Sequence, residues 1–284
     1  MMSPASPFPA ASMVRVALGP SADRLRDCRR NGVTADPEAI HLARVATRRL
    51  RANLKALRGA LGERWDGDVR QELAWIGGLL GAVRDADVLA AAFEEEIKRA
   101  PDTMRHGGAS LLRRLGIERD RAQMTLYVSL DGARFATLIS QLDMLVDGPA
   151  GAPEAIVEPP VVMAPAWRAL KRPVGELGRE PSDGELHAVR IATKRARYAA
   201  EMFATAGDPH ARRFVRRAAR LQEALGGHHD AAVAVQWLLA ATPADAEVGL
   251  STGWLAARFA DERDALRQAW RAPWEALRSE ARFW

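Results

Sequence analysis

Cysteine is almost missing from this chain of 284 residues, because Cys28 is the single one. A framework of disulfides is therefore excluded, and this cysteine usage favours a reducing cytosol. No stretch approaches the run of about 20 apolar residues that a membrane-spanning helix needs. The first residues also lack the basic segment and the long apolar run of a signal peptide. We therefore expect a cytoplasmic protein.

Aromatic residues are scarce as well, at 6% of the chain, whereas Ala, Leu, Arg and Glu are abundant. These four residue types are strong helix formers. Apolar residues make up 48% of the chain, an ordinary value for a globular protein. The length suffices for one large domain or for two smaller domains with cores of their own. The composition predicts an all-α fold.

Lysine is the third scarce residue, with only Lys55, Lys98, Lys171 and Lys194. Nearly all of the positive charge, in a chain of net charge +5 and pI near 9.9, therefore comes from arginine. The planar guanidinium group suits bidentate contact with phosphate, although a GC-rich genome would also enrich arginine. A basic protein attracts anions, and the composition leaves nucleic acid, an acidic membrane surface and a soluble polyanion open.

Helical periodicity runs along most of the chain and is broken once. Residues 147–165 carry five prolines and no helical period, which predicts a proline-rich linker over residues 148–165. Prolines near the start predict a flexible leader over residues 1–14. Asp36-Pro37 is a typical helix start. The predicted helices span residues 21–31, 37–61, 63–80, 85–99, 105–128, 131–146, 166–178, 185–205, 209–225, 229–241 and 246–280.

Two segments of the chain are close copies of two others. Residues 41–51 read HLARVATRRLR, and residues 187–197 read HAVRIATKRAR. A second match follows in the same order, with LGAVRDADV at residues 80–88 and LGGHHDAAV at residues 225–233. The two offsets, 146 and 145 residues, are nearly equal, which predicts an internal duplication. We expect the first repeat over residues 15–147 and the second over residues 166–284.

The first copy carries a stripe of basic residues along one side of its helix. At about 100° per residue, these side chains lie within about 80° of one another. They are His41, Arg44, Arg48, Arg51 and Lys55. Leu50 and Leu54 fall on a separate core face, and Arg49 leaves the stripe. Like charges at this spacing repel by roughly a few tenths of a kcal/mol per pair, so the stripe needs neighbouring acids, free solvation or an anionic ligand.

The second copy repeats the stripe with one departure. The residues that share its basic face are His187, Arg190, Lys194 and Arg197. Glu201 stands where the first copy has Lys55, which predicts a salt bridge or a shorter positive strip in this half. Arg195, like Arg49, is expected to point away. A charged histidine donates hydrogen bonds from both ring nitrogens, and a nearby phosphate raises its pKa.

The paired Leu-Gly segments predict a helix end followed by a helix start. Gly81 and Gly226 are expected to stop helices, and Asp85 and Asp230 to cap the next ones. The residues before the two aspartates would then lie at helix starts, within reach of an anion; they are Arg84 and His229. The stretch after Pro209 adds further, asymmetric candidates, which are Arg213, Arg216, Arg217 and Arg220.

The duplicated His/Arg helix and the paired Leu-Gly segments resemble the conserved-histidine α-helical domain, or CHAD domain, over nearly the whole chain outside the leader and linker. The resemblance implies two antiparallel four-helix bundles, related by a pseudo-two-fold axis, with basic helices facing a shared groove or pore. It also implies non-catalytic binding of inorganic polyphosphate, or of another polyanion, and association with polyphosphate granules. The two basic stripes match the family's basic helices.

The resemblance also has limits in this sequence. No strand pattern of the triphosphate-tunnel domain that is fused to some family members occurs, which favours a stand-alone copy. His228-His229-Asp230 departs from the Arg-Asp of the family at that position.

Two other function classes stay open. The basic stripes permit nucleic-acid binding, but no helix-turn-helix, zinc or RNA-binding signature and no stacking aromatic accompanies the motif. For an enzyme, Asp85-x-Asp87 and His228-His229-Asp230 each look like part of a metal site, but companion ligands are missing. No Walker loop or nucleophile elbow occurs. We expect no catalytic residue, no metal, no cofactor and no membrane partner.

Overall fold

The fold is all-α, as the composition predicts. The computed structural model describes residues 8–30, 36–61, 68–147, 156–241, 243 and 245–281. Within these ranges the only strands are β1 (Phe8–Pro9) and β2 (Ile156–Val157), which pair antiparallel with Phe8 opposite Val157. Every other regular element described is helical.

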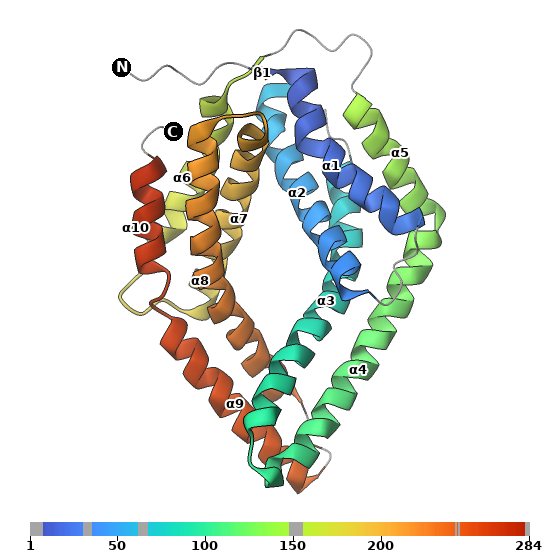
Figure 1. Cartoon of the computed structure of the whole chain (residues 1–284), viewed down its shortest axis with the longest axis vertical. Coiled ribbons are helices and arrows are strands. Elements are labelled where there is room, and N and C mark those ends of the chain that lie inside the picture. The colour runs from blue at the N-terminus through green and yellow to red at the C-terminus, as the bar shows by residue number, and fades with distance from the viewer. Residues whose placement is uncertain are drawn as a thin grey trace.

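The same order of elements occurs twice along the chain (Figure 1). After β1 come α1 (Ala10–Arg30), α2 (Pro37–Leu61), α3 (Val69–Arg99), α4 (Asp102–Asp131) and α5 (Ala133–Asp147). After β2 come α6 (Pro159–Gly175), α7 (Asp183–Thr205), α8 (Pro209–Ala240), α9 (Ala246–Leu266) and α10 (Arg271–Glu280). The two copies of the His/Arg motif therefore lie on the second helix of each series, α2 and α7.

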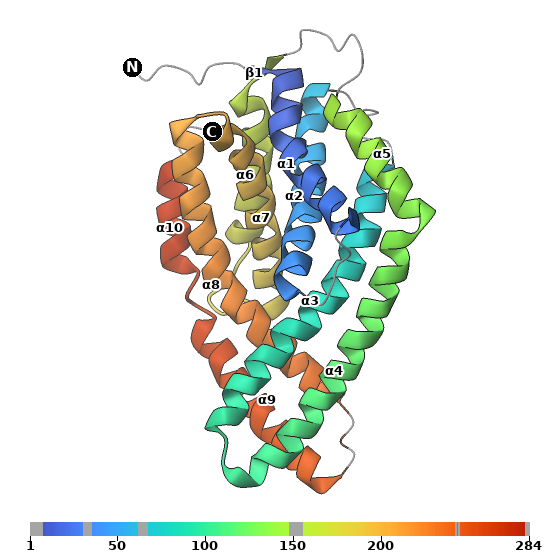
Figure 2. The ribbon, with the colours of Figure 1, turned by 45° about the vertical axis from the view of Figure 1, so that its right-hand side comes forward.

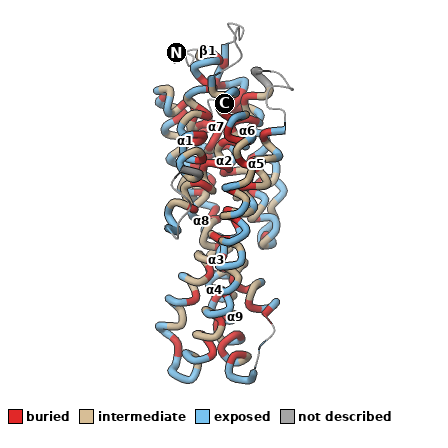
Figure 3. The backbone as a smooth tube through the Cα atoms, turned by 90° about the vertical axis from the view of Figure 1, so that its right-hand side faces the viewer, coloured by how far each residue is buried: buried red, intermediate tan, exposed pale blue. Residues whose placement is uncertain are grey.

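The molecule has a wide end and a narrow tip, and each has a core of its own (Figures 1 and 2). Helices of both series contribute to the larger core at the wide end, where most of the buried chain lies (Figure 3). The tip is built from α3, α4, α8 and α9, and there Phe93 lies 5.5 Å from the ring centroids of both Trp237 and Phe259. Four helices thus pack together at the tip. Two of them come from the first half of the chain and two from the second.

The predicted helix ends at Gly81 and Gly226 are wrong, because α3 and α8 each continue through the glycine. Asp85 and Asp230 are consequently mid-helix residues and not caps. At Gly81 a Cβ atom would lie 3.5 Å from the guanidinium group of Arg44, an ordinary contact distance, so α3 passes close to this arginine of the neighbouring helix. Glycine inside a helix costs about 1 kcal/mol relative to alanine, which burial along the rest of α3 offsets.

The predicted leader and linker are also shorter than expected where the structure describes them. Residues 8–14 form β1 and the first turn of α1, which runs on past Pro20 and buries Ser21, the first residue of the helix predicted over residues 21–31. Residues 156–165 form β2 and the start of α6, whose Pro159 stands at the beginning of the helix, where a missing N–H costs nothing. Residues 1–7 and 148–155 lie outside the described ranges.

Local signals do fix the start of the two motif helices. The Asp36 carboxylate accepts a hydrogen bond of 2.9 Å from the Glu38 N–H at the start of α2. At the start of α7, Ser182 and Glu185 form a reciprocal capping box. In the described ranges, no helix is both long and apolar enough to cross a membrane.

Candidate polyanion-binding site

Helices α2 and α7 contact each other at the wide end, and their basic stripes approach each other from the two halves of the chain. On α2, Leu50 and Leu54 are fully buried, as the helical wheel predicts. On the basic side, His41, Arg44 and Arg48 are half-buried, whereas Arg51 and Lys55 are exposed. Burial lowers the pKa of Arg48, and the positive charge of Arg190 on α7 lowers it further. The structure therefore brings like charges of both stripes together.

Each half places one arginine of the stripe against an aspartate of the next helix. The Arg44 guanidinium lies 2.9 Å from the carboxylate of Asp85 on α3, and Arg190 lies 3.9 Å from that of Asp230 on α8. The two arginine side chains are only 17% and 14% exposed, whereas the aspartates are 58% and 54% exposed. Each aspartate thus orients an arginine of the stripe, while more than half of the aspartate side chain stays exposed to solvent.

His41 and Arg84 lie together in the first half. Burial lowers the pKa of His41, and the charge of Arg84 lowers it further. Arg84 sits one residue before Asp85 inside α3 and not at a helix start as predicted.

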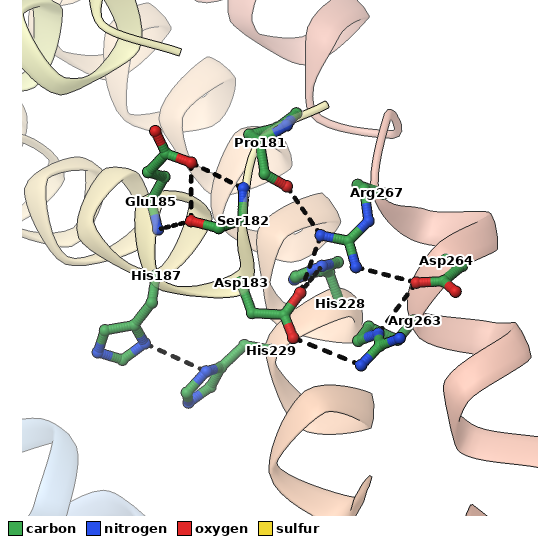
Figure 4. Close-up of polar contacts among 10 residues, drawn as sticks. All are labelled: Pro181, Ser182, Asp183, Glu185, His187, His228, His229, Arg263, Asp264 and Arg267. Atoms are coloured by element: carbon green, nitrogen blue, oxygen red, sulfur yellow. Dashed lines mark hydrogen bonds and ion pairs between the residues drawn. The ribbon is translucent and has the colours of Figure 1, made fainter. Parts of the chain in front are cut away.

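The second half has a pair of histidines at the matching place. His187 on α7 and His229 on α8 face each other, with 3.1 Å between their Nδ1 atoms and 4.5 Å between their ring centroids (Figure 4). At that distance one Nδ1–H donates a hydrogen bond that the other, unprotonated Nδ1 accepts, so at least one ring is neutral. Burial lowers the pKa of His229 to about 3, with a further contribution from Arg190.

Lys194 is the most deeply placed cation of the site, since only 6% of the residue is exposed. Burial lowers its pKa to about 7, and the charges of Arg190 and Arg48 add to this effect. Buried charges in proteins ordinarily have a partner of opposite charge, whereas the groups closest to this ammonium are mostly arginines.

Four stripe cations have no ion-pair partner among the residues that the structure describes: Arg48, Arg51, Lys55 and Lys194. The site therefore combines two arginines held by aspartates with four cations whose charge is not matched by a contacting acid.

Two arginines outside the predicted stripes join the far end of the site. Burial lowers the pKa values of Arg51 and Lys55, and the charges of Arg195 on α7 and Arg70 on α3 lower them further. The helical wheel of α7 directs Arg195 away from the stripe of its own helix. A helical wheel gives only directions around one axis, so it did not reveal that α2 approaches α7 on this side.

Arg197 is engaged within the protein. Its Nε atom lies 3.4 Å from Glu201, and the other carboxylate oxygen of Glu201 lies 2.9 Å from Nε of Arg49 on α2. Both guanidinium groups also approach the ring of Tyr198, at 5.2 and 5.9 Å. The salt bridge predicted at Glu201 is confirmed, and it joins the two halves; Arg197 is less available to a ligand than the other stripe residues.

The arginines near the start of α8 belong to another surface. Arg213 contacts Glu280 of α10 at 2.7 Å. Arg216, Arg217 and Arg220 are exposed and lie about 120° to 180° around α8 from His229, on the side turned away from the site. This arrangement therefore disfavours the predicted role of these three arginines in the binding surface.

His228 has a structural role beside the site (Figure 4). The residue is 2% exposed, and its Nε2 atom lies 3.3 Å from Asp183, which Arg267, the residue after the end of α9, also contacts at 2.9 Å. The network ties the start of α7 to α8 and α9. Within the described ranges, no group of three or more histidine, cysteine, aspartate or glutamate side chains is placed to hold a metal ion.

Comparisons with known proteins agree with this architecture. A family model described as the CHAD domain matches residues 17–239. An uncharacterized protein of Mycobacterium tuberculosis, found in two strains, is 30% identical over 248 residues, which is 83% of this chain and 47% of the relative. The chain thus spans about half the length of the curated relatives it matches.

Two solved structures have the same fold. The CHAD domain of the plant Ricinus communis superposes with a TM-score of 0.77 at 26% identity, over 97% of this chain and 94% of the other. PptA from Streptomyces chartreusis superposes with a TM-score of 0.78 at 23% identity, over 94% of this chain and 100% of the other. The latter likeness shows the fold alone.

Proposed function

The chain belongs to the CHAD domain family, and on this premise we propose that it binds inorganic polyphosphate, without chemical change, between the basic faces of α2 and α7. The primary contacts in this proposal come from His41, Arg44, Arg48, Arg51, Lys55, His187, Arg190 and Lys194. Arg70, Arg84, Arg195 and His229 extend the surface. Association with polyphosphate granules in the cytoplasm is the cellular role that the family resemblance implies.

One observation carries the proposal: two helices from different halves of the chain bring together cations that have no ion-pair partner among the described residues. Arg48 is half-buried and Lys194 is buried. Burial lowers the pKa of Lys194, and the charges of Arg190 and Arg48 lower it further. Like charges in a partly desolvated site repel more strongly than in water. A linear polyanion relieves this repulsion along its whole length, which is why the proposal favours polyphosphate over a small anion.

We further infer that the two walls arose by duplication of one unit. The repeated order of a short strand and five helices within the described ranges supports this inference. The repeated Arg–Asp pair, Arg44 with Asp85 and Arg190 with Asp230, supports it at the level of the site. Each unit supplies one basic wall, so that the binding surface requires both.

A titration with long-chain polyphosphate at two salt concentrations tests the proposed function. Binding through released counterions weakens steeply with salt, by analogy with nucleic acids. A duplex DNA of equal charge serves as the competitor, because DNA lacks the narrow, flexible chain that a site between two helices accepts. Failure of polyphosphate to bind, or displacement of polyphosphate by DNA at equal charge concentration, would contradict the proposal. Release of phosphate during the titration would contradict its non-catalytic part.

A further inference from the structure

The two halves of the site carry cations of different chemistry at equivalent positions. At the offset of 146 residues, Arg48 of α2 corresponds to Lys194 of α7. At the offset of 145 residues, Arg84 of α3 corresponds to His229 of α8. Guanidinium groups stay charged at all physiological pH values, whereas an imidazole and a buried amine do not. The first half therefore has a permanent charge where the second has a titratable one.

The histidine contact limits the charge that the second half holds when it is empty. With their Nδ1 atoms 3.1 Å apart, His187 and His229 do not both carry a proton on that atom. The pair therefore has at most one positive charge in this arrangement. Two rings that instead turned their N–H groups toward phosphate oxygens would each accept a proton and become donors on both sides.

Lys194 also limits the positive charge of the second half, because it is buried without an ion-pair partner of opposite charge among the described residues. Only 6% of the residue is exposed, and no carboxylate lies within ion-pair distance of its ammonium group in the described ranges. Its neighbours are mostly positive: Arg190 on its own helix and Arg44 and Arg48 on α2, against Asp230 on α8. A phosphate that enters between α2 and α7 would be the anion that this ammonium group lacks.

We propose that polyphosphate binding is coupled to proton uptake in the second half of the site, by Lys194 and by the His187–His229 pair, so that this half becomes fully charged only with its ligand. The inference rests on the proposed function, and it adds a property that the family fold does not require. The first half has arginine at both equivalent positions, so these two positions take up no proton on binding.

The direction of the effect follows from the groups that face these side chains. Lys194, whose pKa is about 7 without ligand, faces three arginines and the carboxylate of Asp230. The charged groups facing His229 are Arg190, His187 and Lys194 on α7 and His228 on α8. Burial and these cations lower the pKa of each group, and a bound phosphate raises it. Protons are therefore taken up on binding, and the affinity rises as the pH falls.

Isothermal titration calorimetry in buffers of different ionisation enthalpy measures this proton uptake directly. We expect roughly one proton per site near pH 7, and hence roughly a tenfold gain in affinity per unit of falling pH. The decisive variants are Lys194→Arg and His229→Arg, because each installs the residue that the first half already has. Each is expected to reduce the proton uptake. Lys171→Arg, at an exposed lysine of α6, is the matched control and is expected to leave the proton uptake as in the parent protein.

The outcomes separate the inference from the function on which it rests. Binding with no proton uptake, or uptake that is as large in the double variant Lys194→Arg/His229→Arg as in the parent protein, overturns the inference and leaves the proposed function standing. Absence of polyphosphate binding at every pH overturns both. The terminal groups of polyphosphate also titrate, but they contribute equally to parent and variant, so the difference between the two proteins reports on the site. Circular dichroism identifies a variant that fails to fold, in which case the other single variant decides.

Discussion

Arg44 of α2 and Asp85 of α3 form an ion pair of 2.9 Å inside the basic site, and more than half of the aspartate side chain remains exposed. Its carboxylate therefore competes with a bound anion for the same guanidinium group. We predict that Asp85→Asn tightens polyphosphate binding by about three- to tenfold at low salt, since an interaction of this kind with a partly exposed charge is worth about 1 kcal/mol. A fluorescence or calorimetric titration measures the change.

A second aspartate provides the control for this prediction. Asp102, at the tip, pairs with Arg105 at 2.9 Å and is 89% exposed. Asp102→Asn makes the same change in net charge far from the site. If the two variants gain equal affinity, overall charge and not release of Arg44 is the cause. If Asp85→Asn weakens binding, the aspartate positions Arg44 for the ligand and does not compete with it.

We expect Lys194 to lower the free energy of unfolding in the absence of ligand. Its pKa falls from 10.5 to about 7 on folding, so the unfolded chain holds more protons between these two pH values. The free energy of unfolding of the parent protein therefore rises with pH across that window. We predict that Lys194→Met stabilises the protein by about 1–3 kcal/mol near pH 7, because methionine fills the same space without a charge.

Denaturant unfolding at several pH values checks this. The difference between Lys194→Met and the parent protein should shrink toward pH 10.5, where the parent lysine is neutral in both states. Lys171→Met, at the exposed lysine of α6, should show no such trend. A variant that is less stable than the parent near pH 7 would mean that the ammonium group is favourably solvated in the fold.

The tip depends on a close approach of α4 to α9 at Gly107. A Cβ atom there would lie 2.6 Å from the Glu247 carbonyl oxygen and would also collide with the Ser251 hydroxyl. Gly107→Ala should therefore destabilise the protein by about 1–3 kcal/mol through overpacking. Gly116, on the same helix, has nothing within 4 Å of such an atom, and Gly116→Ala should stabilise by up to about 1 kcal/mol. Thermal unfolding compares the two, and equal effects would contradict the packing described at the tip.

The sequence predicts the helical class and the basic stripes well because both follow from local periodicity. The helix at residues 37–61 begins and ends where its signals place it. The apolar face with Leu50 and Leu54 is fully buried, and the charged side is more exposed. Such features depend on one helix and its immediate surroundings.

The remaining features depend on neighbouring helices, which local patterns do not describe. Gly81 looks like a helix stop, but α3 continues through it beside Arg44 of α2. Arg195 points away from its own stripe and yet meets the charges of α2. Arg216 and Arg220 look like binding residues by type alone, although α8 turns them away from His229. A comparison of both repeats does hint at the Arg–Asp pairs, since arginine and aspartate recur at matched positions.

The central claim is that cations of α2 and α7 act together on one polyanion, and a pair of charge-matched variants tests it most directly. Arg48→Gln/Arg190→Gln removes one stripe charge from each helix, and Arg216→Gln/Arg220→Gln removes two exposed charges of α8. We predict that the first variant loses at least about tenfold in polyphosphate affinity and that its salt dependence falls by about two charges, whereas the second stays within about twofold of the parent protein. Equal losses in the two variants would contradict a site between α2 and α7.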